Sequence, residues 1–385
     1  MIIYPIIFVV SLALIYEGLY LAKKKKIAGS FLISIGVILP CLLAAFRSVS
    51  VGTDTKGYVS GLFEMAGQTD SIGEYYDKAR VWYGISDIAY TTLNFVTAHL
   101  FGSFNVFLFI VELLIILPIF FVLKKYGKTD RTVLLGLGLF FLLEYNVSFN
   151  MVRQCLALSF VILMVGLLYE KKYWQAVLSA LVAFGFHSTS AIAFLMIPIF
   201  IMFRKIGKKG KKLLLICLCV LLIVFVFSFR NIVVFLYETG IYEHGMTFLE
   251  VYSMPDYNFS FIDTTTYLFV LVIYWILCRY DDRSDEKYFE IFLGLGSIIL
   301  LSMGWSIKYM ERISFYLFYP FLLYVIPRVA TIGIKKARTK KALLYENRFI
   351  VILVGYFIIY WFVSFGVMNL HQTIPYEFAE IGVQV

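Results

Sequence analysis

Residues 211–230 read KKLLLICLCVLLIVFVFSFR, so that an uncharged run over 213–229 lies between two lysines and an arginine. The run is apolar on every face of a helix, as a helix surrounded by lipid must be. About 20 such residues cross the hydrocarbon core of a bilayer. The stretch therefore predicts a membrane-spanning helix with its charged residues at the two membrane surfaces.

The rest of the chain repeats this pattern. Of its 385 residues, 61% are apolar and 15% are charged, whereas soluble domains carry about 25% charged residues. No linker or soluble block divides residues 1–385, so we expect a single transmembrane domain. Apolar runs cover residues 3–22, 27–46, 105–123, 132–145, 152–169, 173–186, 190–203, 213–229, 266–278, 289–305, 313–327 and 349–366. They predict an all-α polytopic integral membrane protein with about 12 transmembrane helices.

Basic clusters orient these helices. They lie at 23–26, 124–131, 171–172, 204–212, 279–287 and 328–348, and the positive-inside rule makes them cytoplasmic. With both termini outside, eight of the 34 Lys and Arg residues are extracytoplasmic, namely Arg47, Lys56, Lys78, Arg80, Arg153, Arg230, Lys308 and Arg312. Topology thus explains the net charge of +9, and we expect no nucleic-acid partner. We also expect no cleavable signal peptide, because the first basic run follows the first apolar run.

A weaker apolar run at 85–101 contains Ser86, Asp87, Thr91, Thr92, Asn94, Thr97 and His99. The basic clusters before and after it share a side only if an even number of crossings separates them, and the spans 27–46 and 105–123 already supply two. We therefore expect 85–101 to be a re-entrant or interfacial helix within an outer loop over 47–104, buried in protein. A second outer loop, rich in aromatic residues, covers 230–265.

Three outer arginines, Arg47, Arg153 and Arg312, adjoin apolar helices. An arginine near the hydrocarbon costs about 2.5–3.5 kcal/mol on insertion scales. Snorkelling, or a structural pair such as Glu311 with Arg312, accounts for one of them; three on one side favour a binding site. Spans 152–169, 190–203 and 313–327 also turn their N-termini outward. Arginines beside helix N-termini suit a phosphate or diphosphate.

Two outer residues are candidates for proton transfer. Asp54 lies in a turn-prone loop between Gly52 and Gly57, and His187 precedes hydroxyl residues that can cap the span 190–203. Their ordinary roles are an Asx-turn for Asp54 and a capping or core histidine for His187.

The five cysteines form no ligand-spaced set, so we expect no metal, and no nucleotide-binding motif is present.

The quoted positions also resemble a family. Arg47 with Val51-Gly52-Thr53-Asp54-Thr55 and Tyr58, then Val152-Arg153-Gln154-Cys155-Leu156-Ala157, then Phe186-His187-Ser188-Thr189-Ser190-Ala191, and finally Pro375-Tyr376, are similar to the EpsG-type branch of the Wzy polysaccharide polymerases. The resemblance implies a GT-C-like fold and an enzyme of the bacterial cytoplasmic membrane. Its substrates would be oligosaccharide repeat units carried on undecaprenyl diphosphate, polymerised at the outer face without a nucleotide sugar or cofactor. The products would be exopolysaccharide, capsule or O-antigen, and a chain-length regulator and a flippase would be partners.

Carried onto this chain, the resemblance implies a role for each candidate. Arg47, Arg153, Gln154, Ser188 and Arg312 would bind diphosphate, and Asp54 or His187 would take the acceptor proton. Two alternatives remain open. A lipid-linked oligosaccharide flippase or other transporter would place charges in the midplane, with inverted repeats. A membrane O-acyltransferase would need a histidine deep in the bilayer. The polar layer here is one-sided, which favours the polymerase; the sugar and linkage stay undetermined.

Overall fold

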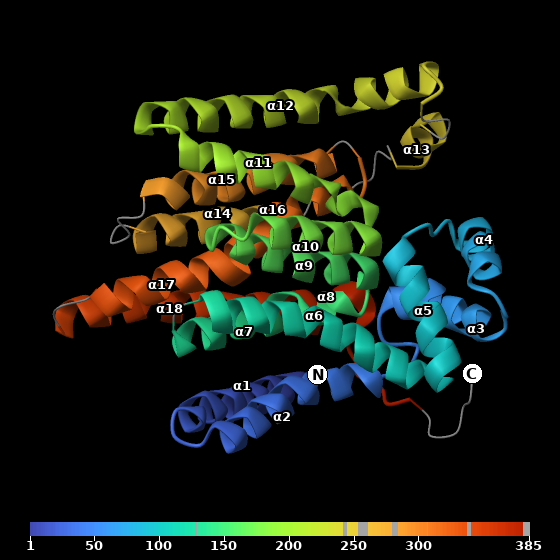
Figure 1. The fold of residues 1–385 in the computed structure, drawn as a ribbon, viewed down its shortest axis with the longest axis horizontal. Helices are drawn as coiled ribbons and strands as arrows, with labels where there is room; N and C mark the ends of the chain where they lie inside the picture. Colours follow the sequence, from blue (N-terminus) through green and yellow to red (C-terminus); the bar gives the residue numbers. More distant parts are fainter. Residues whose placement is uncertain are drawn as a thin grey trace. The chain divides into compact units, whose positions relative to one another are not determined.

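The protein is described from a computed structural model (Figure 1). The structure describes residues 1–127, 129–241, 245–252, 261–278, 284–305, 307–336 and 340–379. In these ranges regular secondary structure is helical, apart from one isolated bridge between Arg47 and Phe378. The chain forms two compact units, the first of residues 1–191 and 347–385 and the second of residues 192–346. The expected single transmembrane domain stays a prediction.

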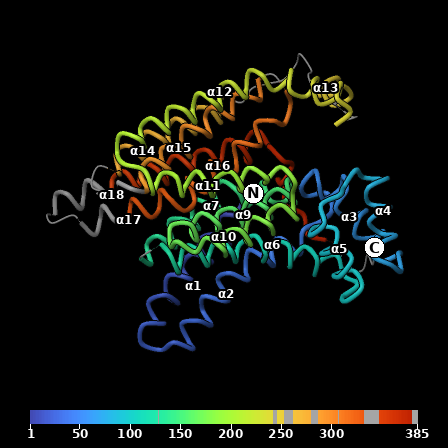
Figure 2. Tube along the Cα trace, turned by 45° about the horizontal axis from the view of Figure 1, so that its top comes forward, coloured from blue at the N-terminus to red at the C-terminus, as the bar shows by residue number. Residues whose placement is uncertain are grey.

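The first unit begins with a helical hairpin of α1 (Ile3–Ala22) and α2 (Lys26–Ala45), which Figures 1 and 2 both show side by side. Glycines allow the close approach. A Cβ at Gly18 would lie 2.7 Å from Ile33 Cγ1, and one at Gly36 would lie 2.7 Å from Ile15 Cγ1. Small residues let helix backbones pack closely in a membrane, where no hydrophobic effect drives helices together.

The core of this unit is α9 (Val152–Tyr169), of whose 18 residues 15 are buried. It packs against α6 (Phe104–Tyr126) and α10 (Tyr173–Phe186). The helices approach closely where Gly166 faces α6, since a Cβ there would overlap Val122. Between α6 and α9, the chain forms α7 (Asp130–Leu143) and the short α8 (Tyr145–Ser148). The backbone at the first turn of α9 is therefore fixed by the packing of the rest of the helix.

The predicted outer loop 47–104 is largely helical. It contains a π-helical turn η1 (Thr55–Val59), α3 (Ser60–Gly67), α4 (Ile72–Tyr83) and α5 (Ile88–Phe101). Helix α5 contacts α3, α4, α6 and α10. It is 14 residues long, roughly 21 Å at 1.5 Å per residue, which is too short to cross a bilayer of about 30 Å. Thr91, Asn94 and Thr97 on its buried face bond to carbonyls of their own helix. The non-crossing orientation of this segment stays a prediction.

The second unit contains α11 (Ile192–Lys205), α12 (Lys208–Glu238), α13 (Gly245–Tyr252), α14 (Phe261–Leu277) and α15 (Ser284–Leu301). The chain continues through η4 (Ser302–Trp305), η5 (Met310–Ser314), α16 (Phe315–Pro320), η6 (Phe321–Val325) and α17 (Ile326–Lys336). Helix α15 contacts α11, α12, α14 and α16 and so forms the centre of this unit. Then α18 (Lys340–Trp361) leads back into the first unit, where η7 (Phe362–Val367) and η8 (Leu370–Gln372) precede the tail.

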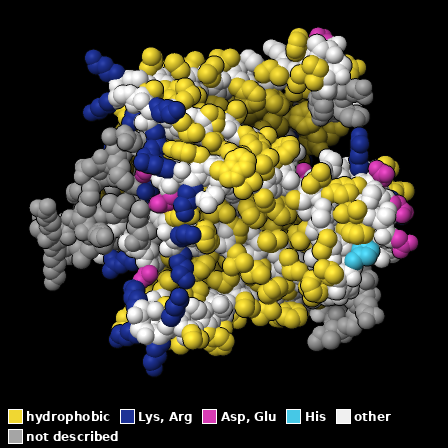
Figure 3. Space-filling model, in the orientation of Figure 1, with side chains coloured by type: hydrophobic (Ala, Val, Ile, Leu, Met, Phe, Trp, Pro, Cys, Tyr) yellow, Lys and Arg dark blue, Asp and Glu magenta, His cyan; other side chains and the backbone are white. Residues whose placement is uncertain are grey.

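The predicted fold class is confirmed. Each of the predicted spans falls on helical residues, and nine helices in the described ranges are long and apolar enough to cross a membrane. Tyr173–Phe186 and Phe261–Leu277 are shorter apolar helices. Of the predicted aromatic loop 230–265, α12 continues to Glu238, whereas residues 242–244 and 253–260 lie outside the described residues. Figure 3 shows Lys and Arg side chains at the beginning of α12 and a mostly hydrophobic surface along it.

Candidate functional site

The carboxylate of Asp87 joins three segments of the first unit. Its Oδ2 lies 2.5 Å from Arg153 Nη1. Its Oδ1 accepts a hydrogen bond from the backbone N–H of Ser188 at 3.1 Å, and His187 Nδ1 lies 3.6 Å from Oδ2. Three predicted site residues, Arg153, His187 and Ser188, are thus brought together by a fourth residue that was not predicted.

Local structure explains why these groups meet. Asp87 is the extended residue before α5, and Arg153 is in the first turn of α9. His187 follows α10 in extended backbone and begins the turn into η2 (Ser188–Ala191). A cation in the first turn of a helix is opposed by the helix dipole, so an anion beside Arg153 relieves an otherwise unfavourable arrangement. Asp87 supplies that anion.

A second carboxylate reaches Arg153 through a tyrosine. The hydroxyl of Tyr58 donates to Asp54 Oδ2 at 2.8 Å, and Arg153 Nε donates to the same hydroxyl at 3.4 Å. The guanidinium carbon of Arg153 lies 5.2 Å from the centre of the Tyr58 ring. Asp54, Tyr58, Asp87, Arg153 and His187 therefore form one connected group, called the Asp87 network below.

The Asp87 network is charged and only partly closed to water. The side chain of Asp87 is 5% exposed, that of Arg153 24% and that of His187 21%. Burial would raise the pKa of Asp87, but the neighbouring His187 and Arg153 outweigh it and hold this pKa below its usual range. Burial, together with Tyr90 and Asp54, raises the pKa of Tyr58 well above its usual value. Asp87 is therefore an anion at neutral pH, and Tyr58 keeps the proton that it donates to Asp54.

Arg47 is held quite differently. It is 3% exposed, and its Nη1 donates to the carbonyl oxygen of Ala44 at 2.7 Å. Its Nη2 lies 3.4 Å from Thr55 Oγ1, and its guanidinium carbon lies 4.1 Å from the centre of the Phe149 ring. Thr55 also donates to the carbonyl oxygen of Phe149 at 3.1 Å. Arg47 thus fastens the residue next to Asp54 to the helix bundle.

Asn150 and residues near the C-terminus also bond to this loop. Asn150 Oδ1 accepts from the backbone N–H of Asp54 at 3.1 Å, and Asn150 Nδ2 lies 2.6 Å from His371 Nδ1. Gly52 donates its N–H to the carbonyl oxygen of Gln372 at 3.0 Å. With φ at +92°, and with a Cβ calculated only 2.4 Å from the Phe149 oxygen, this position requires glycine. Tyr376, in the motif Pro375-Tyr376, donates to the carbonyl oxygen of Leu43 at 2.7 Å.

The remaining predicted residues lie in other surroundings. Gln154 follows Arg153 and is 5% exposed. Ser188 is exposed and meets Asp87 through its backbone rather than its hydroxyl. Arg312 belongs to the second unit, in η5, with its guanidinium carbon 4.2 Å from the centre of the Tyr309 ring. Its convergence with the residues of the first unit stays a prediction.

The central role of Asp87 was not predicted from the sequence, although its position carries one signal. Aspartate is a typical N-cap, and Asp87 lies near the beginning of the predicted run 85–101; the helix itself begins one residue later, at Ile88, and the Asp87 side chain makes no capping hydrogen bond. That signal marks the position but not its partners. Two buried glutamates, Glu112 at 2% exposure and Glu144 at 0%, were also not singled out. Among the residues that the structure describes, no three His, Cys, Asp or Glu side chains are grouped closely enough to hold a metal ion.

The sequence model of the EpsG family matches residues 30–378, which is nearly the whole chain. No curated protein and no solved structure matches. The matched range includes every residue of the Asp87 network, as well as Arg47, Arg312 and the tail up to Phe378.

Proposed function

The chain belongs to the EpsG family, and from this premise we propose that it polymerises lipid-linked oligosaccharide repeat units at the Asp87 network. Family membership indicates a role of the polysaccharide polymerase type for this multi-pass membrane protein. The proposal goes further and assigns the donor, the acceptor and the residues. The observation that carries it is the meeting of Asp87, Arg153 and His187 at the first turn of a buried, apolar helix.

The proposed reaction exchanges one bond at the anomeric carbon of the growing glycan. A hydroxyl oxygen of the incoming repeat unit attacks that carbon, and the bond to undecaprenyl diphosphate breaks. The diphosphate leaves with the electron pair, and the proton of the attacking hydroxyl goes to a base on the protein. A single displacement of this kind inverts the anomeric centre. The site must therefore supply a cation for the diphosphate and one proton acceptor.

Arg153 is the cation that suits the leaving group. Asp87 and Tyr58 hold its Nη1 and Nε, so the planar side chain is fixed in orientation before substrate arrives. The unpaired backbone N–H groups at the start of α9 add to the attraction for a phosphate. Charge that develops on the departing diphosphate is stabilised by such a fixed donor without reorganisation. We propose Gln154 and Ser188 as further contacts of the same group, whereas the diphosphate role of Arg312 stays a prediction from the sequence.

His187 is the better candidate for the base, for a geometric reason. A catalytic histidine needs a third group to orient its ring. Asp87 Oδ2 lies 3.6 Å from Nδ1, just beyond hydrogen-bond distance, and would fill this role once the two atoms approach by a few tenths of an ångström in the substrate complex. In that arrangement Nε2, on the far side of the ring, takes the proton. Asp54 stays the alternative, although its Oδ2 already accepts the Tyr58 hydroxyl. In this proposal Asp87 positions both functional side chains and does not itself react.

One observation favours a different function. Glu112 Oε1 and both carboxylate oxygens of Glu144 are buried and have no hydrogen-bond partner among the described residues. Carboxyl groups inside a membrane bundle are typical of proton and ion pathways. They fit a proton-coupled flippase for lipid-linked oligosaccharide, which is the second candidate. A flippase moves its substrate between two compartments and makes no new glycosidic bond.

The experiment that separates the two uses purified protein in detergent micelles, where no second compartment exists. A labelled lipid-linked repeat unit is added, and the products are resolved by size. A ladder of longer glycans is expected, with free undecaprenyl diphosphate released in proportion to the bonds formed. Unchanged substrate, from protein that is folded and binds the lipid-linked unit, would overturn the polymerase.

The proposed side of the membrane has its own test. We expect Lys56 outside and Lys125 inside, because the basic cluster at 124–131 is cytoplasmic under the positive-inside rule. Single cysteines at these two positions, in a chain without its native cysteines, would be treated in intact cells with an impermeant thiol reagent. Labelling at 56 alone is expected. Labelling at 125 alone would invert the topology and place the Asp87 network inside.

A further inference from the structure

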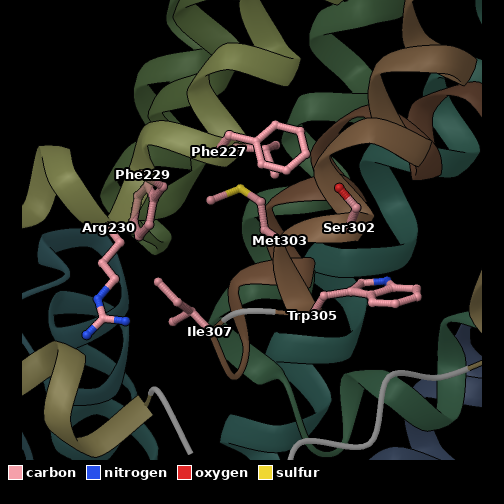
Figure 4. Close-up of a pocket in the computed structure, with 8 residues that line it drawn as sticks. Phe227, Phe229, Arg230, Ser302, Met303, Trp305 and Ile307 are labelled. Carbon is pink, nitrogen blue, oxygen red and sulfur yellow. The ribbon is translucent and has the colours of Figure 1, made fainter.

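A cavity of about 400 Å³ lies in the second unit, where α12 nears its end (Figure 4). One wall comes from α12, with Val226, Phe227, Phe229 and Arg230, and the opposite wall from η4 and Ile307. Figure 4 shows Met303 pointing from η4 toward Phe229, with Arg230 at one side. Apart from Arg230 and Ser302 the lining is apolar, and none of the described lining residues is acidic.

The depth of this cavity in the membrane follows from the length of α12. Arg230 comes 22 residues after Lys208 in one continuous helix, which is roughly 33 Å at 1.5 Å per residue. The hydrocarbon core of a bilayer is about 30 Å thick. When the lysines at the beginning of α12 lie at one membrane surface, Arg230 lies at the other. The cavity then begins at the level of the lipid head groups and continues into the hydrocarbon.

Arg230 is available for a ligand. Its side chain is exposed, and it forms no ion pair or hydrogen bond within the described part of the chain. Nearby, Lys308 follows the lining residue Ile307 and is fixed by its backbone N–H, which donates to the carbonyl oxygen of Tyr252 at 3.0 Å. Trp305, 69% exposed, lines the cavity, and tryptophan is enriched at membrane interfaces. The ligand that fits has an anionic head and a hydrocarbon chain.

We propose that this cavity binds the phosphate end of the polyprenyl lipid carrier, with the phosphate on Arg230 and the first isoprene units against Phe229 and Met303. The volume is at the lower end of the roughly 300–1,000 Å³ typical of small-molecule sites, so only the part of the lipid nearest the head group enters. The remaining chain lies in the bilayer along α12, none of whose central apolar residues is buried within the protein. The inference rests on the proposed function for the identity of the lipid, but its test needs no turnover.

Binding is measured on the full chain in nanodiscs with a photoreactive polyprenyl phosphate as the probe. Arg230→Gln should reduce crosslinking about tenfold at sub-saturating probe, through the loss of a charge-assisted hydrogen bond. Val226→Trp fills the cavity from the exposed helix and should reduce it similarly. Two controls stay on α12: Lys212→Gln removes a positive charge at the other end of the helix, and Leu221→Trp introduces a tryptophan at a position 62% exposed. Both controls should crosslink as the unchanged protein does.

Competition distinguishes the sources of the phosphate. Unlabelled polyprenyl phosphate should displace the probe, whereas phosphatidylglycerol and inorganic phosphate at the same concentration should not. Displacement by phosphatidylglycerol to the same extent would show that the cavity binds an ordinary phospholipid. Normal crosslinking of Arg230→Gln and Val226→Trp would show that the probe does not bind in this cavity. Failure of the proposed function gives another pattern. The ladder would then be absent, while crosslinking stays sensitive to both cavity variants.

Discussion

Arg47 and Arg153 have the same description in sequence, since each adjoins the end of an apolar helix that the charge pattern predicts to face outward. In the structure they differ in every respect that decides function. Arg47 follows the C-terminus of α2, is 3% exposed, and is bound by a carbonyl, a hydroxyl and an aromatic ring. Arg153 stands in the first turn of α9, is 24% exposed, and is bound by a carboxylate.

The direction of the helix explains the difference. At a C-terminus the last carbonyls lack partners, and a cation there is favoured by the dipole. Arg47 donates to one such carbonyl, although its Nε has no hydrogen-bond partner among the described residues. At an N-terminus the dipole opposes a cation, so Arg153 depends on Asp87 and attracts any further anion. We infer that Arg47 stabilises the fold and that Arg153 acts on substrate.

The largest expected effect tests the proton acceptor beside Arg153. His187→Ala should lower the polymerisation rate by about 10²–10⁴-fold, the usual contribution of a general base. Asp54→Asn keeps the shape and the hydrogen bond to Tyr58, and it should lower the rate much less. Initial rates of ladder formation, at equal amounts of folded protein, measure both. If Asp54→Asn is inactive and His187→Ala is normal, the two roles are reversed.

The next effect separates the two arginines directly. Arg153→Lys keeps the charge but loses the planar fork, so the rate should fall about 100- to 1000-fold, as when a fixed donor to a developing anion is removed. Arg47→Lys is the matched control and should retain the rate per folded molecule. If both variants lost rate equally, Arg47 and Arg153 could not be assigned different roles, one in the fold and one on substrate. Normal polymer from Arg153→Lys would remove the diphosphate role.

Sequence patterns were sufficient for the spans because each span is a local property of about 20 residues. They also located Arg153 and His187 as polar residues beside apolar helices. They did not reveal that Asp87 lies beside both, because Asp87 is 66 residues from Arg153 and 101 from Ser188. The packing of α5 against α10, and of α10 against α9, brings these residues together. Nor did they separate Arg47 from Arg153, since burial and partners follow from the tertiary structure.

The third effect concerns stability, and here the larger effect is expected at Arg47 and the smaller one at Arg153. Arg47→Lys should lower the free energy of unfolding by about 2 kcal/mol, through the loss of the contact with the Phe149 ring and of at least one hydrogen bond. Arg153 is nearer to water, so Arg153→Lys should cost less. Reversible unfolding of the protein in mild detergent, titrated with a denaturing detergent, measures the difference. A larger cost at Arg153 than at Arg47 would contradict the structural role assigned to Arg47.

The smallest effect concerns Asp87, the carboxylate that pairs with Arg153 and has no counterpart beside Arg47. The pKa of Asp87 is lower in the folded protein than in the unfolded chain, so its charge stabilises the fold above the ordinary aspartate pKa of about 3.9. That contribution is lost as the pH falls through the lower folded pKa. Asp87→Asn lacks the charge at every pH, but its side-chain oxygen still accepts from Ser188. The variant should therefore be less stable than the unchanged protein at neutral pH, and the gap should close below about pH 4. Asp77→Asn, at an exposed position of the same segment 47–104, should show no such gap. Because Arg153 and His187 both face Asp87, a gap that stays constant or widens in acid would mean that neither partner holds Asp87 as an anion. The ion pair with Asp87, which distinguishes Arg153 from Arg47, would then make no contribution to stability.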